Sequence, residues 1–78
     1  MKVEQIEGSI FEATIPDPYS AIGESYYVVF LWTDTDEAEI LYTSLYIGGV
    51  GQKVEDKKLN RKLKRKLNRY IEQQAQVA

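Results

Sequence analysis

Residues 26 to 47 read YYVVFLWTDTDEAEILYTSLYI and contain the clearest structural pattern of the chain. Aromatic and β-branched side chains dominate both 26–33 and 37–47, a composition that favours extended strands. The polar stretch 34–37 between them is typical of a turn. The two segments therefore predict an antiparallel hairpin, with Thr35 and Asp36 at its tip.

This hairpin register sorts the side chains of the two strands into two faces. One face carries Tyr27, Val29, Leu31, Ile40, Tyr42 and Ser44. The other carries Tyr26, Val28, Phe30, Trp32, Leu41, Thr43 and Leu45. Both faces are rich in apolar residues, whereas a sheet with one solvated face alternates apolar and polar side chains.

A single helix covers only one side of such a sheet, so the second face needs another cover. A homodimer stacked sheet on sheet, a protein partner or a flat ligand would each supply it. The alternative is the proline-rich loop 16–25, with Tyr19 and Ile22, folding back together with the amino-terminal residues. The predicted protein interface consists of Tyr27, Val29, Leu31, Ile40 and Tyr42.

The segments that flank the hairpin complete the predicted sheet. GSIFEATI, residues 8–15, places Phe11, Ala13 and Ile15 on one face and reads as a strand, which Val3 and Ile6 extend upstream past a bulge at Gly8. GGVG, residues 48–51, ends the last strand and turns the chain toward the next element. The prediction is a three-stranded antiparallel sheet.

The carboxy-terminal part of the chain predicts one amphipathic helix. Leu59, Leu63, Leu67 and Ile71 recur at every fourth position, and with Tyr70 they fill an arc of about 120° at 100° per residue. Asp56 is a suitable residue for the helix start. The predicted fold class is therefore α+β, a single domain over residues 1–78 with a three-stranded antiparallel sheet followed by this helix.

Charge is divided unequally along the chain, although the formal net charge is only −2. Residues 1–56 have a net charge of −9, and residues 57–78 have +7. Eight bases lie on the polar arc of the helix: Lys57, Lys58, Arg61, Lys62, Lys64, Arg65, Lys66 and Arg69. This asymmetry points to a binding surface.

Five pairs of these bases stand at the i,i+4 spacing, where each like-charge pair costs about 0.2–0.5 kcal/mol at low salt. A residue choice that opposes stability indicates a negative surface opposite the helix. Nucleic-acid phosphate and an acidic protein surface, including this chain's own acidic part, both fit. An anionic membrane fits less well, because the apolar stripe lacks Trp and Phe and is needed for the core. The remaining reading is a polar face that only contacts solvent.

The residue types that are missing argue against catalysis. The chain has no cysteine and no histidine, which removes thiolate chemistry, the commonest general base and the commonest transition-metal ligand. DTDEAE at 34–39 lacks the spacing of a calcium loop, and the glycines at 48, 49 and 51 with Lys53 match no phosphate-binding loop. We therefore expect no enzyme, no metal and no cofactor.

The amino terminus is charged where a signal peptide is apolar, and no stretch has the length of a membrane span. The sequence predicts a small cytoplasmic binding protein whose basic helix contacts nucleic-acid phosphate. The alternative is an accessory or inhibitor protein, for example of a nucleic-acid-processing complex such as mobile elements encode. It would dock by its apolar sheet face, as a homodimer.

Overall fold

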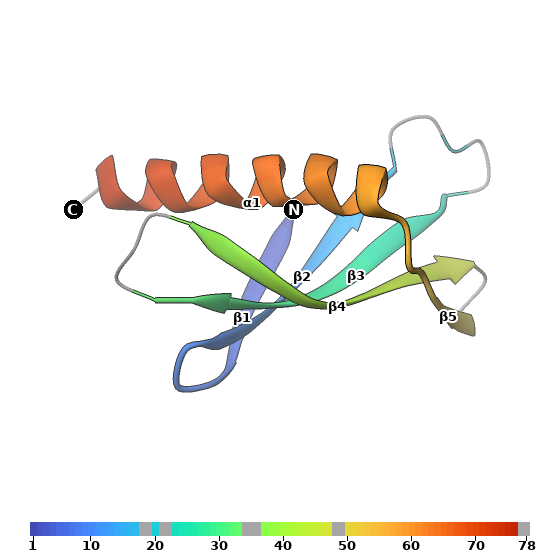
Figure 1. Ribbon diagram of the computed structural model, residues 1–78, viewed down its shortest axis with the longest axis horizontal. Helices are drawn as coiled ribbons and strands as arrows, with labels where there is room; N and C mark the ends of the chain where they lie inside the picture. The colour runs from blue at the N-terminus through green and yellow to red at the C-terminus, as the bar shows by residue number, and fades with distance from the viewer. Residues whose placement is uncertain (18–19, 21–22, 34–36, 48–49, 77–78) are drawn as a thin grey trace.

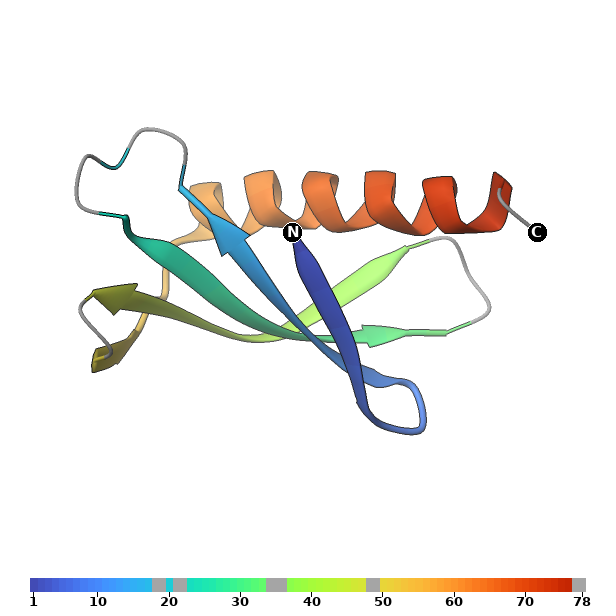
Figure 2. The same ribbon diagram turned by 180° about the vertical axis from the view of Figure 1, so that it is seen from behind.

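A computed structural model describes residues 1–17, 20, 23–33, 37–47 and 50–76 of the 78-residue chain. These residues form β1 (Lys2–Glu7), β2 (Ile10–Pro16), β3 (Ser25–Trp32), β4 (Ala38–Ile47), β5 (Val50–Lys53) and α1 (Lys57–Gln76). The strands form one antiparallel sheet in sequence order, and α1 lies across one of its faces, as Figures 1 and 2 show from opposite sides. The predicted α+β class with a carboxy-terminal helix is confirmed.

The sheet contains five strands, so the prediction of three was wrong. The first additional strand is β1, which forms a hairpin with β2 instead of extending it. Gly8 makes this turn with a φ of 55°, a left-handed conformation that glycine adopts readily. The second is β5, which pairs with the end of β4 through Ile47 and Val50, where a turn into the helix was expected.

The predicted hairpin register holds for only part of the β3–β4 pairing. From Ser25 with Tyr46 to Val29 with Tyr42 the partners are those expected, and then the register shifts so that Phe30 faces Ile40. One additional β4 residue, Leu41, is accommodated there as a β-bulge.

The bulge decides which β4 side chains enter the core. Without it, Glu39 would pair with Trp32 on the helix-covered face, where an unpaired carboxylate is costly to bury. With it, Glu39 is exposed on the opposite face. Ala38 is instead buried beneath the helix and Ile40 packs against the core. The prediction that Ile40 shares a face with Tyr27 and Tyr42 was therefore wrong.

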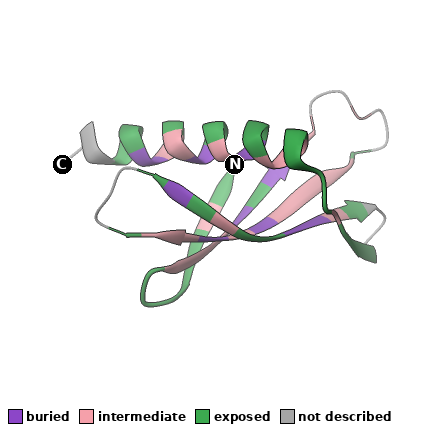
Figure 3. Cartoon of the chain, in the orientation of Figure 1, coloured by how far each residue is buried: buried purple, intermediate pink, exposed green. Residues whose placement is uncertain are grey.

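The hydrophobic core lies between α1 and the sheet. The predicted leucine stripe is confirmed, since Leu63, Leu67 and Ile71 are buried, and Leu59 packs at the margin. Their partners from the sheet are Ala13, Ile15, Val28, Phe30 and Ala38. Figure 3 shows this division on α1, buried toward the sheet and exposed on the outside.

Helix α1 begins at a side-chain cap and is held against β4 by two further hydrogen bonds. Asp56 Oδ1 accepts from the backbone N–H groups of Lys58 (2.9 Å) and Leu59 (3.3 Å), so the predicted helix start is confirmed. Asn60 Oδ1 accepts from the Thr43 hydroxyl at 2.9 Å. Asn68 Oδ1 accepts from the backbone N–H of Ala38, at 2.7 Å. These two asparagines attach the helix to β4 on either side of the bulge.

Several sequence-based predictions concern residues outside the described part of the chain. They are the turn tip at Thr35 and Asp36, the glycines at 48 and 49, and the cover of the sheet by Tyr19 and Ile22.

Candidate nucleic-acid interface

The eight predicted contact residues all lie on α1, away from the core. Seven of them are exposed: Lys57, Lys58, Arg61, Lys62, Arg65, Lys66 and Arg69. Lys64 is partly buried, with 40% of its side chain accessible. The helix packs on the sheet by its leucine stripe, which turns the basic arc outward. The tertiary structure therefore brings the whole predicted set together on one surface, which we call the basic face.

The basic face wraps around most of the outer side of the helix. At 100° per residue, Lys62 and Lys66 lie on one flank, and Lys57 and Arg61 lie on the other. The remaining exposed bases point away from the sheet between these flanks. A chain of phosphates crossing the helix at any angle would therefore meet positive charge.

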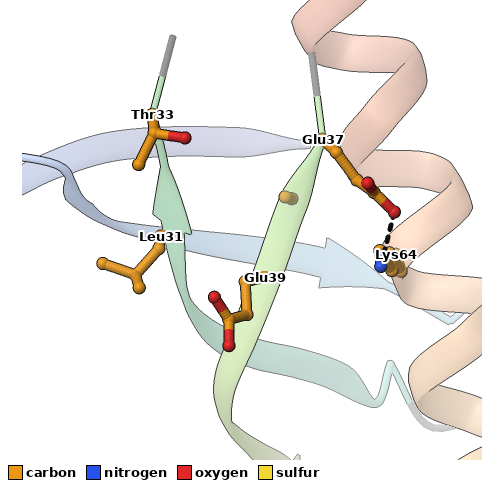
Figure 4. Close-up of a pocket in the computed structure, with 6 residues that line it drawn as sticks. Leu31, Thr33, Glu37, Glu39 and Lys64 are labelled. Atoms are coloured by element: carbon orange, nitrogen blue, oxygen red, sulfur yellow. Dashed lines mark ion pairs between the residues drawn. The ribbon is translucent and has the colours of Figure 1, made fainter. Parts of the chain in front are cut away.

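Lys64 differs from the other seven bases because it has a partner within the fold. Its Nζ lies 2.8 Å from Oε1 of Glu37, and Figure 4 shows this ion pair at the start of β4. The hydrogen bond and the positive charge of Lys64 lower the pKa of the Glu37 carboxyl from its ordinary value. Asn60 and Asn68 lie four residues before and after Lys64, on the same side of α1. Both asparagines bond to β4, and Lys64 bonds to Glu37, the residue that precedes β4.

The other seven bases of α1 have no ion pair among the described residues. The two remaining ion pairs join Lys2 to Glu4 and Lys53 to Glu55, each at 3.1 Å. Both pairs link residues two positions apart and lie outside α1. Neutralisation of the helix by the chain's own acidic part is therefore limited to Lys64 in this part of the structure.

Two grooves bring apolar surface next to these cations. A groove of about 410 Å³ between α1 and the adjoining ends of β2 and β3 is lined by Ile15, Pro16, Asp17, Tyr26, Leu59, Lys62, Leu63 and Lys66. Burial, and then the negative charge of Asp17, raises the pKa of the Tyr26 hydroxyl. A second groove of about 340 Å³ lies on the opposite flank, where Ile40 meets Lys57 and Arg61. Each flank of the basic face thus combines positive charge with a nonpolar surface.

The predicted protein interface is brought together only in part. Tyr27, Val29, Leu31 and Tyr42 lie on the face of the sheet that α1 does not cover, which we call the open face. Ile40 lies on the helix side because of the bulge. A homodimer through the open face stays a prediction.

Several residues of the open face were not predicted from the sequence. Tyr46 belongs to it, because it continues the alternation of Tyr42 and Ser44 along β4. Glu12 and Glu39 also belong to it, from β2 and from the shifted end of β4. Alternation alone could have found Tyr46, but the position of Glu39 depends on the bulge.

Within the described residues there is no cluster of three or more acidic side chains suited to a metal ion. The one helix of that same region lacks the apolar length needed to cross a membrane. Comparisons with protein-family models, with curated proteins and with solved structures found no match to this chain.

Proposed function

We propose that this protein binds nucleic acid through phosphate contacts made by the basic face of α1. The observation that carries the proposal is the group of seven exposed bases on one helix that have no acidic partner among the described residues. Counterion release from nucleic acid rewards such a surface, because each phosphate neutralised by Lys or Arg frees condensed cations.

The energetics of the helix support a negatively charged ligand. Lys64 is the one base of α1 with an ion pair among the described residues, and it belongs to none of the five i,i+4 pairs of bases. The described ion pairs therefore do not relieve the repulsion between the other seven bases. The five like-charge pairs together cost about 1–2.5 kcal/mol at low salt. A phosphate backbone removes this cost on binding, whereas solvent alone does not.

The dimensions of the basic face suit a short stretch of backbone. Residues 57–69 span about 18 Å along the helix axis at 1.5 Å per residue. Duplex DNA rises about 3.4 Å per base pair, so the face covers roughly five base pairs. Seven cations over this length are enough to neutralise several phosphates.

The contacts proposed here favour binding that depends little on base sequence. Asparagine is a side chain that reads adenine edges, but both asparagines of α1 are engaged by β4. The exposed outer positions are occupied by Lys and Arg, apart from Glu72 and Gln73. We therefore expect phosphate contacts to dominate, with similar affinity for unrelated sequences.

The test is fluorescence anisotropy with a labelled 20-base-pair duplex and a single strand of the same length, at 50–200 mM salt. The variant Arg65→Gln/Arg69→Gln removes two contacts. Its log–log salt slope on the duplex should be shallower by about 1.8, since each phosphate contact contributes about 0.9. At 0.1 M salt the affinity should fall about eight-fold per contact, from the same slope extrapolated to 1 M.

The chain offers a matched control in its two bases outside α1. Lys2→Gln/Lys53→Gln removes the same charge from the sheet, so its salt slope and affinity should stay near those of the unchanged protein. Equal losses in both double variants would show that net charge, not the basic face, governs binding. No binding by the unchanged protein at 50 mM salt would overturn the proposed function.

A further inference from the structure

The open face of the sheet combines aromatic rings with carboxylates. Tyr42 and Tyr46 are each 39% exposed, and the Tyr46 ring meets Tyr27 edge to face at 5.9 Å between centroids. The Tyr27 hydroxyl donates a hydrogen bond of 2.5 Å to Oε2 of Glu12. Exposed tyrosine rings beside negative charge suit a cation, since the ring face and the carboxylate attract it together.

A buried hydroxyl without a partner lies within this cluster. Ser44 is 2% exposed, and its Oγ has no hydrogen-bond partner among the described residues. A Cβ at Gly51 would lie 3.1 Å from Ser44 Oγ and 3.1 Å from Cζ of Tyr46, so the Tyr46 ring stands over Gly51 beside this hydroxyl. A buried polar atom of this kind is costly and calls for a partner group.

Among the described residues, the unpaired charges on the open face are negative. Lys2 and Lys53 point to this side of the sheet, but each is paired with a neighbouring acid, Glu4 and Glu55. Glu12 and Glu39 have no basic partner among the described residues.

Glu39 also borders a hollow of about 330 Å³, which lies where β3 ends and β4 begins. Figure 4 shows Leu31, Thr33 and Glu39 around this hollow, with Glu37 turned instead toward Lys64. The lining of the hollow is mainly polar and includes Lys64, whose charge is balanced by Glu37. Within the described residues, Glu39 therefore offers an unpaired carboxylate beside the side chain of Leu31, which can contact the long stem of a lysine or arginine.

We propose that the open face docks a lysine- or arginine-rich segment of a partner protein. The exposed rings of Tyr42 and Tyr46 receive the cationic side chains, and Glu12 on β2 and Glu39 on β4 supply opposite charge on the same face. The interface thus uses cation–π contacts and charge pairing on a surface that α1 leaves open.

Two other occupants fit this face less well. A nucleic acid could stack its bases on the tyrosines, but its phosphates would then meet Glu12 and Glu39. In a second copy stacked sheet on sheet, the described cations of this face are Lys2 and Lys53, which are already paired with Glu4 and Glu55. A basic protein segment gains from both the rings and the carboxylates.

This inference does not depend on the proposed function of the basic face, because the two surfaces lie on opposite sides of the molecule (Figures 1 and 2). If both hold, the protein joins nucleic acid on one side to a basic protein on the other.

The test is an NMR titration of the isotope-labelled protein with a hexa-arginine peptide, with hexaglutamate as the comparison peptide. The basic helix repels hexa-arginine, so the amide signals that shift should belong to Tyr27, Glu39, Tyr42 and Tyr46. Glu39→Lys should weaken the peptide about five-fold, since it removes one attraction and adds one repulsion. Tyr42→Ala, which keeps the charge, should weaken it about three-fold through the lost cation–π contact.

Glu72→Lys is the matched control, since it makes the same charge change on the exposed side of α1. It should alter the affinity for hexa-arginine less than two-fold, and circular dichroism should show that all three variants are folded. An equal effect of Glu72→Lys, or shifts that avoid the tyrosines, would overturn the proposal. The same shifts with hexaglutamate, with a single-stranded oligonucleotide or on raising the protein concentration alone would also overturn it.

Discussion

Replacement of Arg61, Arg65 and Arg69 by glutamine should make the folded protein more stable while it removes positive charge from the basic face. The change eliminates three like-charge i,i+4 pairs, because Lys57 pairs with Arg61 and the arginines pair with one another. At 0.2–0.5 kcal/mol per pair, the free energy of unfolding should rise by about 0.6–1.5 kcal/mol at low salt. All three arginines are exposed, and among the described residues none of them has an ion pair that the change would remove.

The measurement is thermal and urea unfolding followed by circular dichroism, at 10 mM and at 500 mM salt. A gain of 0.6–1.5 kcal/mol corresponds to a rise in Tm of about 2–12 °C for a domain of this size. Arginine and glutamine have similar helix propensities, so the comparison isolates charge. The gain should shrink at 500 mM salt, because exposed charges are then screened within a few ångströms.

Lys64→Gln provides the internal comparison, because it removes one positive charge from the same helix. Lys64 has asparagines at both i,i+4 positions and an ion pair with Glu37. Its replacement relieves no i,i+4 repulsion and removes an exposed ion pair, so the free energy of unfolding should fall slightly instead of rising. A loss of stability in the triple variant, or a gain that is the same at both salt concentrations, would refute the electrostatic reasoning.

Two further predictions concern groups inside the fold. Asn68→Ala should lower the free energy of unfolding by about 1–3 kcal/mol, because the N–H of the buried Ala38 loses its acceptor. Urea titration measures this change. A loss no larger than that caused by an alanine substitution at an exposed position would contradict the prediction. The Glu12 hydrogen bond and burial raise the pKa of Tyr27 to about 12. The unfolded chain loses this proton near pH 10, so the stabilisation is complete below pH 10 and is lost between pH 10 and 12. Absorbance titration should show a tyrosine step near pH 12 that Tyr27→Phe removes, and a titration unchanged by that substitution would exclude the assignment.

The helix and its polarity were readable from the sequence because both are local properties. A four-residue repeat of Leu59, Leu63 and Leu67 specifies which side of a helix is buried, whatever it packs against. The capping role of Asp56 likewise depends on backbone groups two and three residues away. The outward direction of the basic arc follows from the same periodicity, so the position of the basic face on α1 could be predicted.

The strand count and the faces of the sheet were harder to predict, since they depend on pairing between distant residues. The sequence from Val3 to Ile15 fits either one bulged strand or two strands joined at Gly8. The choice was decided by the hydrogen bonds that β1 makes with β2. In the same way, nothing local at Val50 distinguishes a turn from a short edge strand paired with Ile47.

The bulge at Leu41 marks the boundary between what the sequence determined and what the tertiary structure decided. Alternation of apolar residues identified β4 as a strand, but a one-residue shift in register exchanges its two faces. The packing of α1 resolves this choice. Asn68 accepts a hydrogen bond from the N–H of Ala38, and Ala38, not Glu39, is buried beneath the helix. The sequence by itself thus determined a basic amphipathic helix and a hairpin. The long-range contacts between them packed Ile40 against the core and left Glu39 exposed on the open face.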